Sequence, residues 1–349
     1  MNFCQVFIVK VLLFSVATVG AVTPPAAGEA LRTYVWECPL SSFEAVGYRA
    51  SVAKLIESYE QATGVPLKIE KRQRVGIKID TNSGPGLATP QALVQAVIEV
   101  LEDRGIAREK MFLIDKNESQ LRDAGYIKGY HQEHYAFLGV PVLILDSERY
   151  YHPDWFYESN LPTKEPALRL QRETELSYQE HPDERKSYLP LPLIAEVEFW
   201  INLPIATDSQ SFAINGALAN ATLWNISNNR RFFDNPVNAS VAIAEIAGIP
   251  ELKRGWIFTL VTLECYQYIG GPQFNSLYTI SEPKLWLSTN PVALDALLLK
   301  RINYWRERSK FPVIEQQPAF FEYAKNFGYG PYHFDELKLL LLTSDSSNP

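Results

Sequence analysis

Short apolar runs alternate with amphipathic stretches along most of the chain, which is the pattern of an α/β fold. Residues 75–79 form a mostly apolar, β-branched run that predicts a buried strand. A polar turn follows, and Thr89 and Pro90 predict the N-cap and first turn of a helix that ends at Gly105. Residues 111–114 predict the next strand. Because a helix joins the two strands, we expect them to run parallel in one sheet.

The same alternation continues towards the C-terminus. Further strands are predicted at residues 141–145, 196–203, 256–263 and 284–288. Helices are predicted at residues 48–62 and 237–247, from Pro291 onwards, and as a short element at 334–342. Together these elements predict a mostly parallel sheet of about five to seven strands, flanked by helices. We place this sheet in a single α/β domain over residues 33–345.

Residues 147–192 break the alternating pattern. This stretch is rich in Tyr, Pro, Glu and Arg and shows no sustained hydrophobic period. We interpret it as a long irregular surface insertion, with one short helix at residues 166–177.

The N-terminus has the pattern of a secretory signal peptide. Lys10 precedes an apolar run at residues 11–22, and small residues follow it. The run is shorter than the about 20 residues that a membrane-spanning helix needs. We therefore predict a signal peptide at residues 1–27, a secreted or periplasmic mature protein, and no membrane span in the mature chain. An uncleaved N-terminal membrane anchor is the alternative, if the apolar residues before Lys10 are counted as well.

Charge and metal-ligand patterns exclude several classes of partner. The net charge is −7 and an acidic residue interrupts the most basic cluster, residues 68–74, so we expect no nucleic acid partner. His131 and His134 could share one helix face, but a zinc site needs three or four ligands and no further ligand motif follows. We predict no metal and no cofactor. Cys38 and Cys265 remain outside the leader, and we favour two unpaired thiols over a disulfide.

Polar residues gather at the ends of the predicted strands. In parallel α/β sheets, ligands bind outside the carboxyl ends of the strands. The residues at these ends are Lys78, Asp80, Asp115, Asn117, Asp146, Asn202, Glu264 and Ser288. Asp, Asn and Ser also end strands for structural reasons, because they form turns and cap helices. The glycine-containing loop at residues 82–86 runs into a helix N-terminus, where free N–H groups could hold an anion.

Lys78 lies inside an apolar strand, where an unpaired ammonium group is costly. It must snorkel to solvent or find a partner, and Asp80, Asp115 and Glu264 are the candidates. The pairing is either part of a ligand site or a structural ion pair.

Several short motifs occur in an order that resembles a known family. They are VGIKID at residues 75–80, the turn that ends in Thr89-Pro90, INLP at 201–204, GALAN at 216–220, Gly271-Pro272, and S-x-N-P-x-A-x-D at 288–295. Over residues 32–342 the chain is similar to the family called domain of unknown function 362, which has no established general activity. The resemblance implies site roles for Lys78, Asn202, Asn220 and Asp295.

The chain also departs from this family's pattern. A Lys and a His that usually follow INLP are Ala206 and Asp208 here, and the Lys of the family's Lys-Asn pair is Ala219. Asp80 stands where an Asn is usual. Some members carry a cysteine-rich iron–sulfur segment, and this chain has none. The resemblance therefore implies an activity that is altered or lost.

Two functions of different classes are consistent with these patterns. The first is an exported protein that binds a small anionic or polar ligand at the carboxyl ends of the strands, through Asp115, Asn202, Asn220, Ser288 and Asp295. The alternative is an enzyme that acts on such a ligand by general acid/base chemistry, with Lys78 as the cation or acid and Asp80 or Glu264 as the base. An enzyme needs its acid and base within reach of one substrate atom, whereas binding needs only well-placed polar groups.

Overall fold

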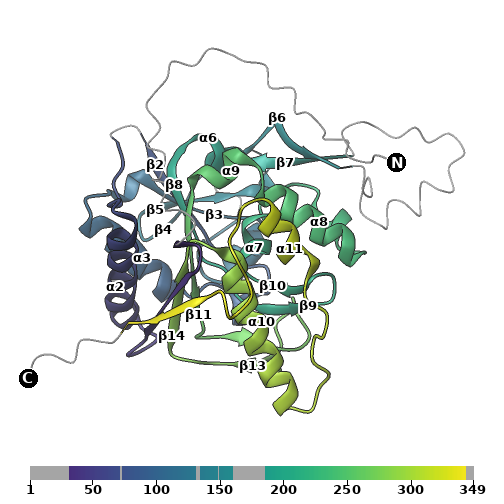
Figure 1. The fold of residues 1–349 in the computed structure, drawn as a ribbon. Coiled ribbons are helices and arrows are strands. Elements are labelled where there is room, and N and C mark those ends of the chain that lie inside the picture. Colours follow the sequence, from purple (N-terminus) through teal and green to yellow (C-terminus); the bar gives the residue numbers. More distant parts are fainter. Residues whose placement is uncertain (1–30, 71–72, 131–133, 148, 160–184, 343–349) are drawn as a thin grey trace, which may run out of the picture.

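The computed structural model describes residues 31–70, 73–130, 134–147, 149–159 and 185–342. Within these residues, the main sheet has nine strands, which are drawn in Figure 1. Their spatial order is β15 (Lys338–Leu341), β1 (Tyr34–Pro39), β14 (Lys284–Ser288), β11 (Trp256–Thr262), β8 (Val197–Asn202), β2 (Arg74–Lys78), β3 (Met111–Asp115), β5 (Val140–Ile144) and β4 (Tyr135–Phe137). All run in one direction except β14 and β4, so the predicted mostly parallel α/β sheet is confirmed.

The five central strands β11, β8, β2, β3 and β5 are parallel neighbours, so their carboxyl ends meet at one edge of the sheet. These strands are almost wholly apolar because both faces of the sheet are covered. The register places Lys78 beside Asn202 on one neighbouring strand and beside Ile114 on the other. Asp115 directly follows Ile114, so its carboxylate lies next to the ammonium group of Lys78.

Two helical layers cover the sheet (Figure 1). The helices α2 (Ala45–Thr63) and α3 (Gln91–Asp103) pack on one face, over side chains such as Val75 and Ile77. The opposite face, which includes Phe112 and Trp200, carries six further helices of the described residues. These are α6 (Leu191–Ala195), α7 (Ala217–Ala221), α8 (Pro236–Ala247), α9 (Pro250–Gly255), α10 (Pro291–Arg308) and α11 (Ala319–Asn326).

Smaller elements complete the described fold. A short helix, α4 (Glu118–Asp123), follows β3 and is capped by Asn117, whose side chain accepts the Gln120 N–H. A second sheet contains β10 (Ala213–Asn215), β9 (Thr207–Ser209), β12 (Tyr266–Gln267) and β13 (Thr279–Ile280). Among the residues described, no helix is long and apolar enough to cross a membrane. Both Cys38 and Cys265 are free thiols, as expected.

The ends of the predicted irregular insertion are regular. β6 (Tyr151–Glu158) and β7 (Lys186–Pro190) pair as an antiparallel hairpin within the stretch 147–192. The prediction of an irregular insertion is therefore wrong for these two segments, because their pairing joins residues about thirty positions apart, beyond the reach of a local pattern. The helix expected at residues 166–177, the leader at 1–27 and His131 lie outside the described residues.

Two local predictions are wrong. Residues 334–342 do not form a helix, because Lys338–Leu341 form β15 beside β1, where the Lys338 N–H donates to the Thr33 carbonyl. Thr89 does not cap α3, whose N-cap residue is Pro90. The Thr89 hydroxyl instead accepts the Asp80 N–H and donates to the Leu203 carbonyl at 2.6 Å, which joins β2 to the segment after β8.

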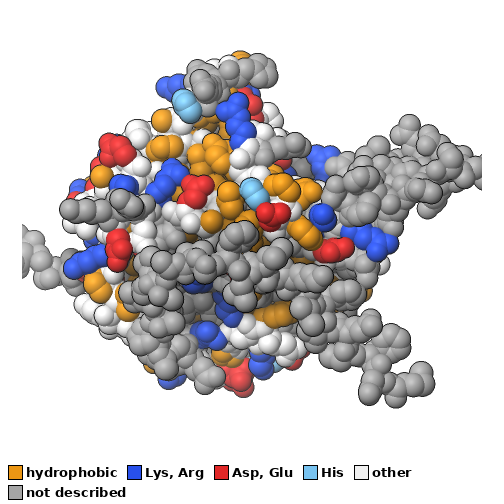
Figure 2. All heavy atoms as spheres, turned by 90° about the horizontal axis from the view of Figure 1, so that it is seen from above, with side chains coloured by type: hydrophobic (Ala, Val, Ile, Leu, Met, Phe, Trp, Pro, Cys, Tyr) orange, Lys and Arg blue, Asp and Glu red, His pale blue; other side chains and the backbone are white. Residues whose placement is uncertain are grey.

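Figure 2 views the molecule from the end at which α6 and α9 lie in Figure 1. Basic, acidic and hydrophobic side chains alternate on this face. No continuous basic patch is visible among its described residues, in keeping with the net charge of −7.

Candidate functional site

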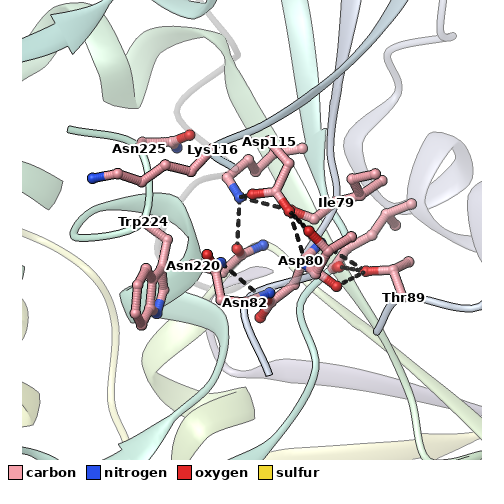
Figure 3. A network of polar contacts seen from close by, with 12 residues as sticks. Ile79, Asp80, Asn82, Thr89, Asp115, Lys116, Asn220, Trp224 and Asn225 are labelled. Carbon is pink, nitrogen blue, oxygen red and sulfur yellow. Dashed lines mark hydrogen bonds and ion pairs between the residues drawn. The ribbon is translucent and has the colours of Figure 1, made fainter. Parts of the chain in front are cut away.

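Lys78, at the end of β2, is fully buried and fully bonded. Its Nζ donates to the Ile79 carbonyl at 2.6 Å, to Asp115 Oδ1 at 2.7 Å and to Asn220 Oδ1 at 2.8 Å (Figure 3). An ammonium group has three hydrogens, so all of them are used. Of the three partners considered for this lysine, the structure selects Asp115.

The groups around Lys78 extend this bonding into a closed network. Asp115, also fully buried, uses Oδ2 to accept the N–H and the hydroxyl of Thr81, at 2.8 and 2.7 Å. Asn220 Nδ2 donates to Asn202 Oδ1 at 2.9 Å, and Asn202 Nδ2 donates to the Ala217 carbonyl. We call Lys78, Thr81, Asp115, Asn202 and Asn220 the Lys78 network. It ties together β2, β3, β8 and α7, which are far apart in the sequence.

Asp80 lies beside the network without bonding to Lys78. One of its carboxylate oxygens accepts both the N–H and the side-chain amide of Asn82, each at 3.1 Å. Burial raises the pKa of Asp80, the nearby charge of Lys78 opposes this rise, and the charge of Asp115 adds to it. Asp80 therefore shapes the turn that follows β2.

Glu264 and Ser288 are not part of the Lys78 network. Glu264 accepts a 2.5 Å hydrogen bond from the Tyr48 hydroxyl, and burial raises the pKa of this carboxyl. The Ser288 hydroxyl donates to the Tyr34 carbonyl and accepts the Asn290 N–H. The expectation that Ser288 ends a strand at the ligand edge is wrong, because β14 runs antiparallel to β11 and so ends in the opposite direction.

Asp295 holds the start of α7, the helix that carries Asn220. Its carboxylate accepts the Ala217 N–H at 2.6 Å and the Leu218 N–H at 3.0 Å, at the start of α7. Burial raises the pKa of Asp295 to about 7, and the two backbone hydrogen bonds oppose the rise. Gly216 allows this approach, because a Cβ there would lie 2.3 Å from Asp295 Oδ1. Asp295 is thus a positioning residue that holds α7, and with it Asn220.

Lys116, which the sequence analysis did not single out, is a second cation at this edge. Its Nζ donates to the Ile226 carbonyl at 2.8 Å and to Asn229 Oδ1 at 2.7 Å, so one hydrogen is left over. Both partners are neutral, and the side chain is partly exposed. Burial lowers the pKa of Lys116 to about 8, with Asp146 the largest opposing charge.

Three buried polar atoms of the described residues lack a hydrogen-bond partner. Among the described residues, the buried side-chain atoms without a hydrogen-bond partner are Ser83 Oγ, Asn215 Nδ2 and Asn225 Oδ1. Asn215 and Asn225 flank α7. Trp224, the residue before Asn225, donates its indole N–H to Asn215 Oδ1 at 2.7 Å. Leaving such a group unpaired costs about 1–3 kcal/mol.

We call Lys116, Asn215, Trp224 and Asn225 the Lys116 site. Figure 3 shows Lys116, Trp224 and Asn225 beside the Lys78 network, on the side of Asn220. The sequence carried one usable signal for this site, since Lys116 directly follows Asp115 at a predicted strand end. Trp224 and Asn225 lie in a stretch without hydrophobic period, so no pattern pointed to them.

Within the described ranges, no group of three or more His, Cys, Asp or Glu residues is placed to hold a metal ion. The arrangement can therefore offer one ammonium group, amide groups and an indole ring to a ligand.

Comparisons with known proteins add little to this geometry. No family model matches the chain, and no curated protein matches it. The resemblance to the family called domain of unknown function 362 therefore stays a prediction. One solved structure that aligns with the chain is a Thermotoga maritima protein from the Northeast Structural Genomics Consortium. It is 10% identical, with a TM-score of 0.36, and the alignment covers 76% of this chain and 59% of that protein.

Proposed function

We propose that the protein binds a small anionic ligand at the carboxyl ends of its parallel strands, through Lys116, and catalyses no reaction on it. The observation that carries this proposal is the environment of the Lys116 ammonium group. It is partly buried, bonded only to neutral oxygens, and left with one hydrogen to donate. An anion that accepts this hydrogen would supply the counter-charge that the direct contacts lack.

The depressed pKa of Lys116 agrees with this reading. A pKa of about 8 means that burial disfavours the charged form of the amine. A bound carboxylate or phosphate favours the charged form, so the binding of an anion and the protonation of Lys116 support each other. We therefore expect the site to bind an anion near neutral pH, where Lys116 carries its proton.

The geometry of Lys78 disfavours the enzymatic alternative. A general acid must reach the substrate atom that it protonates. Lys78 is fully enclosed and has no hydrogen left to donate, and the proposed bases Asp80 and Glu264 bond to other groups. We assign the Lys78 network the role of fixing α7 against the sheet, which pre-organises the neighbouring Lys116 site.

The proposal is tested by isothermal titration calorimetry of the mature chain with acetate, cyclohexanecarboxylate and inorganic phosphate at pH 7. Mass spectrometry of the native protein identifies any small anion that co-purifies. Lys116→Met should weaken binding of the best anion at least about tenfold, since a hydrogen bond to a charged group contributes about 1.5–3 kcal/mol. Lys128→Met, which removes an exposed lysine, is the matched control. Equal affinities for the wild type and Lys116→Met, or no binding of any anion, would refute the proposal.

We also propose that the protein is exported, on the strength of the N-terminal pattern alone. Sequencing the N-terminus of the mature protein should find a start between Ala21 and Gly28. An intact Met1 on a soluble cytoplasmic protein would contradict export.

A further inference from the structure

We infer that the ligand of the Lys116 site is a small polyhydroxylated carboxylate, such as a sugar acid. This inference rests on the proposed anion binding at Lys116 and adds the chemistry of the rest of the ligand. Three features carry it: an unpaired acceptor at Asn225, an unpaired donor at Asn215, and the indole of Trp224 between them in the bonding pattern.

The unpaired acceptor requires a hydrogen-bond donor on the ligand. Asn225 Nδ2 already donates to the Ala221 carbonyl at 2.9 Å, which fixes the amide so that Oδ1 is the atom left over. A bare carboxylate has no hydrogen to give to this oxygen, nor has the dianion of a phosphate monoester. A ligand that carries an O–H or N–H in addition to its negative charge satisfies this oxygen directly.

The unpaired donor requires an acceptor on the same ligand. Asn215 uses Oδ1 to accept the Trp224 indole N–H, and its Nδ2 hydrogens have no partner. A hydroxyl group donates one hydrogen bond and accepts two, so a set of hydroxyls can serve Asn225 and Asn215 together. An ammonium group can serve only Asn225, because it accepts none.

The ammonium group of Lys116 is held beside the backbone that carries Asn225. Lys116 Nζ bonds the carbonyl of Ile226, the residue directly after Asn225. A carboxylate on Lys116 would therefore bring its neighbouring hydroxyls towards Asn225, as in a hydroxy acid or a uronate ring. The partly exposed indole of Trp224 offers an apolar face for the C–H groups of such a ring.

Trp224 lies next to both amides, by a hydrogen bond to Asn215 and along the chain to Asn225. Asn215 and Asn225 are fully buried, whereas Trp224 contacts the first, precedes the second and is partly exposed. A ligand hydroxyl that bonds to these amides would therefore change the surroundings of the Trp224 ring, which is hydrogen-bonded to Asn215. Ligand binding should therefore change tryptophan fluorescence, and Trp224→Phe should remove that change.

The test compares three six-membered rings by titration calorimetry: D-galacturonate, cyclohexanecarboxylate, which lacks the hydroxyls, and D-galactose, which lacks the charge. D-galacturonate should bind at least about tenfold more tightly than cyclohexanecarboxylate, because it satisfies groups that otherwise stay unpaired. Asn225→Leu should abolish that preference while cyclohexanecarboxylate still binds, and thermal unfolding checks that this variant remains folded. The comparison of the three rings on the wild type stands without any variant.

The outcomes separate the two proposals. If both carboxylates bind equally and both need Lys116, anion binding stands and the polyhydroxylated ligand is refuted. If D-galactose binds as tightly as D-galacturonate, the charge is unnecessary and the proposed function fails together with the inference. If phosphate alone binds at Lys116, the anion site stands and the carboxylate class is refuted.

Discussion

Replacing Lys78 by methionine removes the buried ammonium group while keeping most of the volume of the side chain. Asp115 then loses the one ion-pair partner that the described residues give it, and Asn220 Oδ1 loses the donor at 2.8 Å. Breaking a buried ion pair by removing one partner costs about 3–5 kcal/mol, because a charge remains enclosed without compensation. We expect Lys78→Met to lower the free energy of unfolding by that amount, which is a large fraction of the about 5–15 kcal/mol of a typical protein.

The assay is urea unfolding at pH 7, followed by tryptophan fluorescence, with the urea dependence compared between variants. Arg49→Met is the control, because Arg49 and Asp103 form an ion pair whose side chains are 48% and 55% exposed. Exposed pairs of this kind contribute about 0–1 kcal/mol. The double variant Lys78→Met/Asp115→Asn should lose less than the sum of its single changes, since the second change neutralises the stranded carboxylate. A loss below about 1 kcal/mol for Lys78→Met, or strict additivity in the double variant, would show that the pair does not hold the edge together.

Three further predictions concern the central sheet and the helices that pack on it. The pKa of Asp295 is raised to about 7 in the folded protein, so between pH 4 and pH 7 the folded state binds a proton that the unfolded state has lost. The free energy of unfolding should therefore fall by about 4 kcal/mol as the pH rises from 4 to 7, and then level off. Urea unfolding measures this slope, which should be absent in Asp295→Asn. Anion binding at Lys116 should weaken roughly tenfold per pH unit above its pKa of about 8 as the ammonium is lost, and pH-independent calorimetric affinities would contradict the role of this amine. Gly76→Ala should destabilise the fold by about 1–3 kcal/mol in urea unfolding, since the new Cβ would lie 2.7 Å from Leu193 Cδ2 and 3.0 Å from Trp200 Cβ; an unchanged midpoint would mean that these neighbours move freely.

The centre of the fold could be predicted from the sequence because each central strand carries its own signal. The apolar runs at residues 75–79 and 256–263 coincide with β2 and β11 within one residue at each end. The outer strands depend on a neighbour instead. β15 is exposed along its whole length, and only its pairing with β1 distinguishes it from a helix turn.

The candidate site was predictable in part, because one of its residues carries a signal in its own strand. A lysine inside an apolar strand must be paired, which pointed to Lys78, and Asp115 was among the three partners considered. The prediction for Ser288 was wrong because a short apolar run does not show in which direction its strand runs in the sheet. Lys116 was not predicted as a site residue because its partners, Ile226 and Asn229, lie 110 and 113 residues away in the sequence.

The distribution of charge at this edge links the buried network to the proposed ligand. Asp115 gives Oδ1 to Lys78 and Oδ2 to Thr81, so its negative charge is already committed inside the protein. Lys116, the next residue, is held by a backbone carbonyl and an amide oxygen, which orient its ammonium group without neutralising it. Asp115 is thus bonded to Lys78 and Thr81, and it acts on the partly exposed Lys116 only through its charge, as Asp146 does. A positive charge that is positioned and has no directly bonded carboxylate is what an anion-binding site needs, and the network beneath it keeps that charge in place.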